Sequence, residues 1–222
     1  RVLLLVYRNT DVDYAEGGVT KHMTTSMSQA EIDKALARFN RFKQYVPDYS
    51  SGEATIDATV VHVSRPVNSL TAIGSSYWLS PNDIRNELNT YAPRGAYDSV
   101  EALWQSCSSS LNTCIPPFGW GSSVSASDWS KGATYASMIF GWSWWWDWEA
   151  DSAQLYLHEW LHGAMDFYSS LGYVMPVGGL DSAGEHGYTK SPVDSWAAWY
   201  RVVMTGQVWE PSLSRYVGIT PA

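Results

Sequence analysis

The residues best suited to catalysis are the two histidines and the glutamate of the run His158-Glu-Trp-Leu-His162. In a helix, positions four residues apart lie on the same face, so both imidazoles could bind one metal ion. Glu159 would lie beside that ion, where a carboxylate can take a proton from the attacking water. This spacing of histidine and glutamate predicts one catalytic zinc ion.

The residues around this run favour the helix that such a site requires. Apolar side chains recur at spacings of four, three and four residues, whereas the histidines fall on a different face. The stripe consists of Leu157, Leu161, Ala164 and Tyr168. We expect a helix over residues 151–169 that is stopped by Gly172.

A catalytic zinc ion takes three protein ligands, so a third ligand must come from elsewhere in the chain. Asp166 continues the histidine row, but it lies about 12 Å from His158 along a helix and cannot share the same ion. We read Asp166 as a supporting carboxylate or as a solvated residue. The next candidates are Asp181, Glu185 and His186, which follow a Gly/Pro-rich loop and are all chemically able to bind the ion.

Length and charge limit the remaining function classes. The chain of 222 residues predicts one catalytic domain with a sheet-bearing lobe over 1–169 and a C-terminal lobe over 170–222. The net charge of −8, without a basic stripe, argues against nucleic acid and anionic membrane surfaces. No apolar run is long enough to span a bilayer. The sequence does not determine the oligomeric state.

The two cysteines indicate where the protein acts. Cys107 and Cys114 lie in a Ser/Asn/Pro-rich stretch with no other thiol in the chain, which favours a local disulfide over two free thiols. A disulfide points to a secreted protein. The opening run 1–7 is too short for a signal peptide, so any targeting segment is expected to have been removed.

Hydrophobic patterns predict an α+β layout with strands mainly before residue 141 and helices after it. Ser28 begins a helix with a capping box, and Pro47 is expected to end it. Asp11 and Asp13 are expected in a solvated turn. The expected strands are 2–8, 55–64, 98–104 and 133–140, the other helices 80–91 and 191–205, and the loops 105–131 and 172–180.

A dense group of tryptophans precedes the predicted metal-binding helix. Large aromatic side chains usually dominate cores and interfaces, so we favour packing between the two lobes. The alternative is a cleft wall that holds an apolar or sugar-bearing substrate. The group consists of Trp142, Trp144, Trp145, Trp146 and Trp148.

Residues 133–205 resemble the zincin metallopeptidases. The run from His158 to Asp166 is similar to the HExxH-x-x-x-Asp motif of thermolysin-like enzymes, in which a later Glu would correspond to Glu185. Their Asn-Glu-x-x-Ser-Asp signature is missing, however. Aspzincins instead use the Asp of a Gly-Thr-x-Asp-x-x-Tyr-Gly motif, which Gly179-Leu-Asp181 and the following His186-Gly-Tyr188 resemble without the Thr and with a spacing that differs by two residues. The resemblance favours Asp181 as third ligand, then Glu185, then His186.

The zincin resemblance also implies an architecture and a substrate-binding strand. It implies an upper lobe with a mixed sheet and helices, an active-site helix that carries the HExxH motif, and a smaller helical C-terminal lobe. In zincins an edge strand just before the active-site helix pairs with the substrate backbone, and residues 133–140 stand in that place. Ser137 and Met138 are therefore expected to bind an extended peptide.

The chemistry expected from these residues is zinc-dependent hydrolysis of a peptide or protein substrate, most simply by an endopeptidase. Glu159 would act as general base, and Tyr188 is the candidate donor to the developing oxyanion. Two alternatives stay open at this point. The chain could be a Trp-rich module that binds carbohydrate or protein and carries the motif incidentally, or it could be a zinc hydrolase that acts on a non-peptide substrate.

Overall fold

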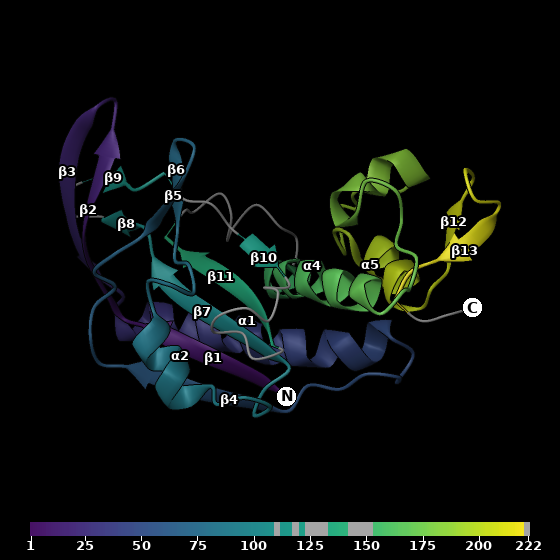
Figure 1. Ribbon diagram of the computed structural model, residues 1–222, viewed down its shortest axis with the longest axis horizontal. Coiled ribbons are helices and arrows are strands. Elements are labelled where there is room, and N and C mark those ends of the chain that lie inside the picture. The colour runs from purple at the N-terminus through teal and green to yellow at the C-terminus, as the bar shows by residue number, and fades with distance from the viewer. Residues whose placement is uncertain (109–111, 117–119, 123–132, 142–152, 220–222) are drawn as a thin grey trace.

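A computed structural model describes residues 1–108, 112–116, 120–122, 133–141 and 153–219 of the chain (Figure 1). Helices and strands are mixed in it, in agreement with the general α+β prediction. The tryptophan group at 142–148 lies outside the described residues. None of the described helices is long and apolar enough to cross a membrane.

The centre of the fold is a five-stranded sheet with the strand order β10-β11-β7-β1-β4. Neighbouring strands are parallel except β10, which runs antiparallel to β11. The strands are β1 Val2–Tyr7, β4 Ala58–Val63, β7 Ser99–Gln105, β10 Trp120–Ser122 and β11 Thr134–Phe140. All of β1 is buried, which explains why its sequence is an uninterrupted apolar run and confirms the expected strand there.

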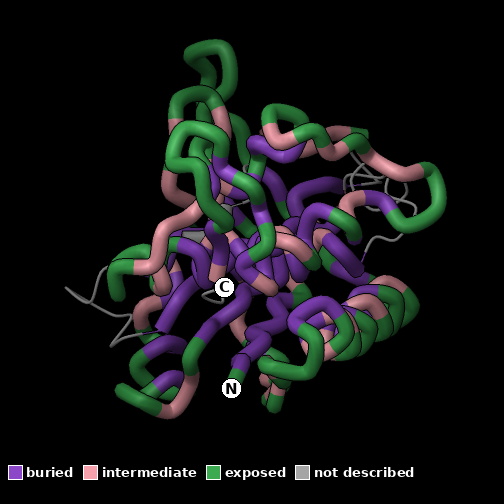
Figure 2. Tube along the Cα trace, turned by 90° about the vertical axis from the view of Figure 1, so that its right-hand side faces the viewer, coloured by how far each residue is buried: buried purple, intermediate pink, exposed green. Residues whose placement is uncertain are grey.

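Alternate residues of a strand point to opposite faces of the sheet, so a strand that is apolar throughout needs cover on both faces. Helices provide that cover here. Leu4 of β1 packs in a core that it shares with the long helix α1 (Gln29–Tyr49) and with α4 (Gln154–Ser170), which carries the histidines. Its neighbour Leu5 points to the other face and packs with α2 (Arg85–Tyr91). Figure 2 shows the buried trace gathered in the middle of the molecule and the exposed trace on its outer turns.

Helix α1 begins as predicted but ends later. Ser28 and Glu31 form the predicted capping box. Pro47, however, lies inside the helix, which continues to Tyr49, so the prediction that Pro47 ends it was wrong. A proline in the last turn removes one backbone N–H but leaves the following residues able to stay helical, and Ser50 N still donates to Val46 O.

The first segment that sequence analysis missed is a hairpin of β2 (Asn9–Glu16) and β3 (Val19–Ser26). Asp11 and Asp13 belong to β2 and not to a turn, because they alternate with buried neighbours and point outward. Gly17 and Gly18 make the connection with positive φ angles of 62° and 80°. A smaller hairpin of β5 (Thr71–Ile73) and β6 (Ser76–Trp78) was also missed.

The stretch 105–131 is not simply a loop. It contains the end of β7 and the short strands β8 (Cys107–Ser108), β9 (Thr113–Cys114) and β10. Cys107 lies directly opposite Cys114 in the β8–β9 pair, and the two form the predicted disulfide with an S–S distance of 2.07 Å. Strand propensity was hidden here by the many serine and proline residues.

The C-terminal segment is less helical than predicted. Its elements are the 3₁₀ helix η1 (Leu180–His186), the helix α5 (Ala197–Met204) and a hairpin of β12 (Val208–Glu210) and β13 (Arg215–Val217). The helix expected over 191–205 is shorter because Ser191 and Ser195 pair in a turn before α5 begins. Figure 1 shows this hairpin and the β2–β3 hairpin at opposite ends of the long axis.

Candidate metal centre

The two motif histidines meet on one face of α4. The Nε2 atoms of His158 and His162 are 3.1 Å apart, one helical turn from each other. Their rings lie edge to face with centroids 4.7 Å apart. Two ring nitrogens this close need either a shared proton or a shared cation between them.

Asp181 brings a carboxylate to the same point from η1. Its Oδ1 lies 3.3 Å from Nε2 of His158, and its Oδ2 lies 3.7 Å from Nε2 of His162. The three ligand atoms lie within 4.8 Å of one another, and no other group of three such residues was found in the described part of the chain. We call His158, His162 and Asp181 the His–Asp cluster. It could hold a metal ion.

The protonation states of the His–Asp cluster suit metal binding. Burial, together with the neighbouring His158, lowers the pKa of His162 to about 4. A hydrogen bond with His158 lowers the pKa of Asp181 below its ordinary value. At neutral pH, His162 is therefore a neutral imidazole and Asp181 a carboxylate, which are the forms that bind metal ions.

A tyrosine from α5 fixes the orientation of His158. The Tyr200 hydroxyl lies 3.0 Å from Nδ1 of His158. In the tautomer that leaves Nε2 free for a metal ion, Nδ1 carries the proton and donates it to the Tyr200 oxygen. Such a partner holds the ring in place and makes Nε2 a better ligand.

The position of Asp181 depends on hydrogen bonds to its own short helix. The indole N–H of Trp199 donates to the Leu180 carbonyl over 2.7 Å, and the Ser182 hydroxyl donates to the Gly179 carbonyl over 2.6 Å. Gly179 has a φ of 73° and a ψ of −156°, a conformation that is essentially restricted to glycine. These contacts fix the start of η1, where Asp181 lies.

Glu159 is on the side of α4 that packs against the sheet, and its side chain is almost completely buried, with the residue 4% exposed. Helix α4 contacts both β10 and β11. The approach to β11 is close at Gly163, where an added Cβ would lie 2.8 Å from Cβ of Thr134. Glycine is therefore required directly after His162 for this packing.

Glu101 of β7 is a second carboxyl group beside Glu159. It is fully buried, and neither of its carboxyl oxygens has a hydrogen-bond partner within the described ranges. Burial, and then the charge of Glu159, raise the pKa of Glu101 well above its usual value, which favours the protonated form of Glu101.

Sequence analysis missed Glu101, Tyr200 and Trp199. A single acidic residue inside the apolar run of β7 was a usable signal for Glu101. Tyr200 is one of fourteen tyrosines, and only the fold distinguishes it and Trp199 from the others.

The prediction that residues 133–140 form an edge strand was wrong. Strand β11 pairs with β7 on one side and with β10 on the other, with Ser137 opposite both Ala102 and Trp120. Ser137 and Met138 are buried, and the Ser137 hydroxyl accepts hydrogen bonds from Leu79 N and the Trp104 indole. Strand order cannot be read from a sequence, and β10 covers the position that β11 was expected to expose.

The other proposed site residues lie apart from the His–Asp cluster. Glu185, His186 and Tyr188 line a cavity of about 780 Å³, and neither histidine of α4 nor Asp181 lines it. Tyr188 packs against Trp199 with ring centroids 5.3 Å apart, so its role as oxyanion donor stays a prediction. Asp166 is exposed at the next turn of α4, where its charge raises the pKa of His162 slightly against the effect of burial.

Comparison with models of known protein families, with curated proteins and with solved structures finds no match for this chain. The arguments for a function therefore come from the His–Asp cluster, its surroundings and the motif resemblance of the sequence.

Proposed function

We propose that this protein is a zinc-dependent hydrolase that cleaves peptide bonds, with Glu159 as general base. The observation that carries the proposal is the convergence of two imidazole nitrogens and one carboxylate oxygen on a single point, with the buried Glu159 next to His158 in the chain. Two nitrogens and one oxygen form a donor set that suits zinc, which keeps a further coordination position for water in catalytic sites.

Zinc bound by His158, His162 and Asp181 would supply a Lewis acid that lowers the pKa of water and polarises a carbonyl group. Glu159 then accepts the proton of the attacking water and delivers it to the leaving nitrogen. The packing of α4 against β10 and β11 holds Glu159 in place and limits the access of bulk water.

Glu101 supports this assignment because its raised pKa favours its uncharged form near Glu159. Two buried carboxylates at close range would repel each other, whereas one neutral and one ionised group can coexist. Of these two carboxyl groups, Glu159 is therefore the one that can accept the proton of the attacking water.

The Cys107–Cys114 disulfide supports action in an oxidising compartment, so we propose that the enzyme is secreted. A peptide substrate follows from the zincin resemblance of residues 133–205. Endopeptidase activity on proteins is the simplest form of this chemistry.

The substitution Glu159→Gln tests the proposal. The amide keeps the size of the side chain but cannot accept the proton, so we expect hydrolysis to fall about 10²–10⁴-fold while zinc content stays near one ion per chain. Activity is measured on a fluorogenic peptide library, and zinc by atomic absorption after dialysis.

Glu53→Gln, which changes an exposed carboxylate in a turn, is the matched control and should keep full activity. A fully active Glu159→Gln protein would refute the role of Glu159. Wild-type protein that holds no zinc after dialysis would refute the metal site itself and favour a binding module.

A further inference from the structure

The C-terminal hairpin carries two exposed aromatic side chains side by side. Trp209 of β12 lies directly opposite Tyr216 of β13, and their ring centroids are 5.3 Å apart. They are 49% and 56% exposed, although large aromatic residues usually gain stability by burial. We call this pair the aromatic platform.

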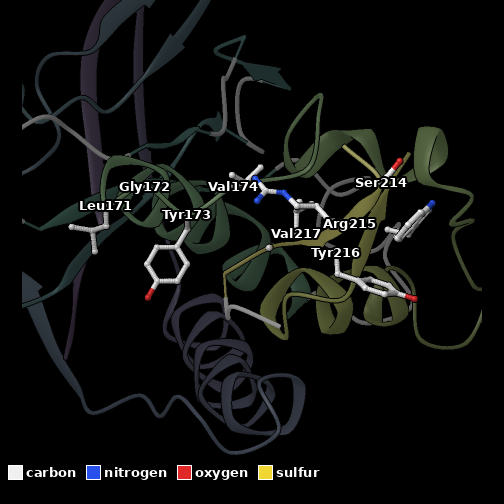
Figure 3. A pocket seen from close by; sticks show the side chains of 10 residues that line it. Leu171, Gly172, Tyr173, Val174, Ser214, Arg215, Tyr216 and Val217 are labelled. Atoms are coloured by element: carbon white, nitrogen blue, oxygen red, sulfur yellow. The ribbon is translucent and has the colours of Figure 1, made fainter. Parts of the chain in front are cut away.

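Hollows lie on both sides of the aromatic platform, and both are lined by Trp209 and Tyr216. One has a volume of about 760 Å³ and reaches from the hairpin to Tyr173 and Val174 (Figure 3). The other has a volume of about 780 Å³ and reaches to the end of η1. Volumes of this size suit small-molecule ligands, and the two hollows share Trp209 and Tyr216 as lining residues.

Polar groups of both hydrogen-bonding kinds surround the aromatic platform. Arg215, whose side chain extends toward Val174 in Figure 3, and Gln207 can donate, whereas the Glu185 carboxylate can only accept. Positive and negative groups are both present, so the surface does not select an anion or a cation.

The aromatic platform is held rigidly by Glu210 on the inner face of the hairpin. Glu210 accepts hydrogen bonds from the Ser212 hydroxyl over 2.6 Å and from Val177 N over 3.1 Å. Gly218 N donates to Val174 O, which ties the end of β13 to the loop before η1. A surface that is ordered before binding loses little conformational entropy when a ligand arrives.

We propose that the aromatic platform binds a saccharide chain. The C–H-rich faces of sugar rings pack on aromatic faces, which carry partial negative charge, while the hydroxyl groups at the ring edges need both donors and acceptors. Trp209 and Tyr216 provide the aromatic faces. The hydrogen-bond donors and acceptors come from the side chains of Arg215, Gln207 and Glu185.

The aromatic platform and the His–Asp cluster belong to the same segment of chain. The helix η1 begins next to Asp181 and ends at His186, which lines the second hollow. These two residues are at most about 10 Å apart along a 3₁₀ helix. If the proposed hydrolase function holds, the platform would direct the enzyme to glycan-bearing proteins.

Binding of oligosaccharides by isothermal titration calorimetry tests this proposal. The probes are chitohexaose, cellohexaose and xylohexaose, each titrated into the Glu159→Gln protein and into the same protein after metal removal. We expect at least one probe to bind, with equal affinity in both forms, because the aromatic platform does not include the metal ligands. Binding that survives metal removal separates this proposal from the hydrolase function.

Trp209→Ala and Tyr216→Ala should each weaken binding about tenfold, and Trp209→Phe should restore part of the loss. Tyr91→Ala, which removes an exposed aromatic ring from α2, is the matched control and should bind like the parent. Circular dichroism checks that each variant is folded. If an alanine variant does not fold, Trp209→Phe still tests the role of the Trp209 ring.

Three results would overturn the proposal. The first is that no probe binds at millimolar concentration, and the second is that Trp209→Ala and Trp209→Phe bind as tightly as the parent. The third is that decaproline, titrated in parallel, binds in a Trp209-dependent way while the saccharides do not, which would assign the surface to proline-rich peptides.

Discussion

Two regions of the molecule bring histidine side chains to aspartate side chains, and they differ in how the ring nitrogens are used. On the β2–β3 hairpin, Nδ1 of His22 lies 2.8 Å from Asp13 and Nε2 lies 3.2 Å from Asp11. Each nitrogen faces a different carboxylate, so no single point is shared. At the His–Asp cluster, the Nε2 atoms of two histidines and the carboxylate of Asp181 converge on one point.

This difference follows from the elements that carry the residues. Cross-strand pairing places His22 opposite Asp13 on an exposed face, and water can satisfy whatever the pair leaves open. A helical turn places His158 next to His162 in a partly buried position, where an unpaired nitrogen costs more free energy. The comparison teaches that convergence and burial, and not the residue types, distinguish a cluster that could hold a metal ion from a surface ion pair.

The largest expected effect is the loss of metal after His162→Ala or His158→Ala. Structural zinc sites with four ligands are worth about 10–16 kcal/mol, so one ligand corresponds to roughly 10²–10³-fold in affinity. Competition with a chromophoric chelator measures this loss. His22→Ala is the matched control and should keep the affinity, and an equal loss in that variant would remove the distinction between the two regions.

The next effect concerns the carboxylate that completes the His–Asp cluster. Asp181→Asn should weaken zinc binding roughly 10²-fold, because the amide oxygen replaces a charged ligand with a neutral one. Glu185→Gln, four residues further along, should leave the affinity unchanged because Glu185 lines the separate cavity. The same chelator competition ranks the two variants, and a larger loss in Glu185→Gln would make Glu185 the third ligand.

The stability of the metal-free protein should fall as the pH is lowered from about 6.5 to 4. The folded pKa of His162 is about 4, below the ordinary value of 6.5, so the unfolded chain takes up this proton first. The contribution of His162 to stability is complete above pH 6.5 and is lost through this window; it amounts to about 3 kcal/mol. Urea unfolding at several pH values measures it, and His162→Gln should remove this part of the pH dependence. If that variant keeps the full slope, the burial of His162 is not its cause.

The smallest effect is expected for the tyrosine that supports His158. Tyr200→Phe removes the hydroxyl near Nδ1 and keeps the ring, so zinc affinity should fall about tenfold. Tyr188→Phe is the matched control for metal affinity, since Tyr188 packs on Trp199 and lines the cavity that neither His158 nor His162 lines. Equal zinc affinity in Tyr200→Phe and wild-type protein would show that the hydroxyl does not support the ligand.

The sequence predicts the parts of the molecule that depend on local periodicity. The buried strand β1, the capping box of α1, the histidine-bearing helix α4 and the disulfide all follow from residues close together in the chain. The spacing of His158 and His162 is of this kind, and their approach in space needs only a helix.

The sequence does not predict features that depend on which strands become neighbours. Residues 133–140 were expected at a sheet edge because they precede the helix, whereas strand order is set by long-range packing, and β10 pairs there instead. The supporting contacts of Tyr200 and Trp199 likewise join segments about twenty to forty residues apart. The hydrophobic pattern alone did not indicate the β2–β3 hairpin. The Gly17–Gly18 pair, which is typical of a tight turn between two strands, could have predicted it.

The glycine contact between α4 and β11 has a consequence for the kinetics of metal uptake. Gly163 lets the helix lie directly on Thr134, so the packing that positions the histidine row does not depend on the ligand atoms themselves. If the His–Asp cluster binds zinc, we therefore expect fast uptake with almost no change in helical circular dichroism. A chain that had to fold around its ion would instead take it up slowly and gain helix as it did so.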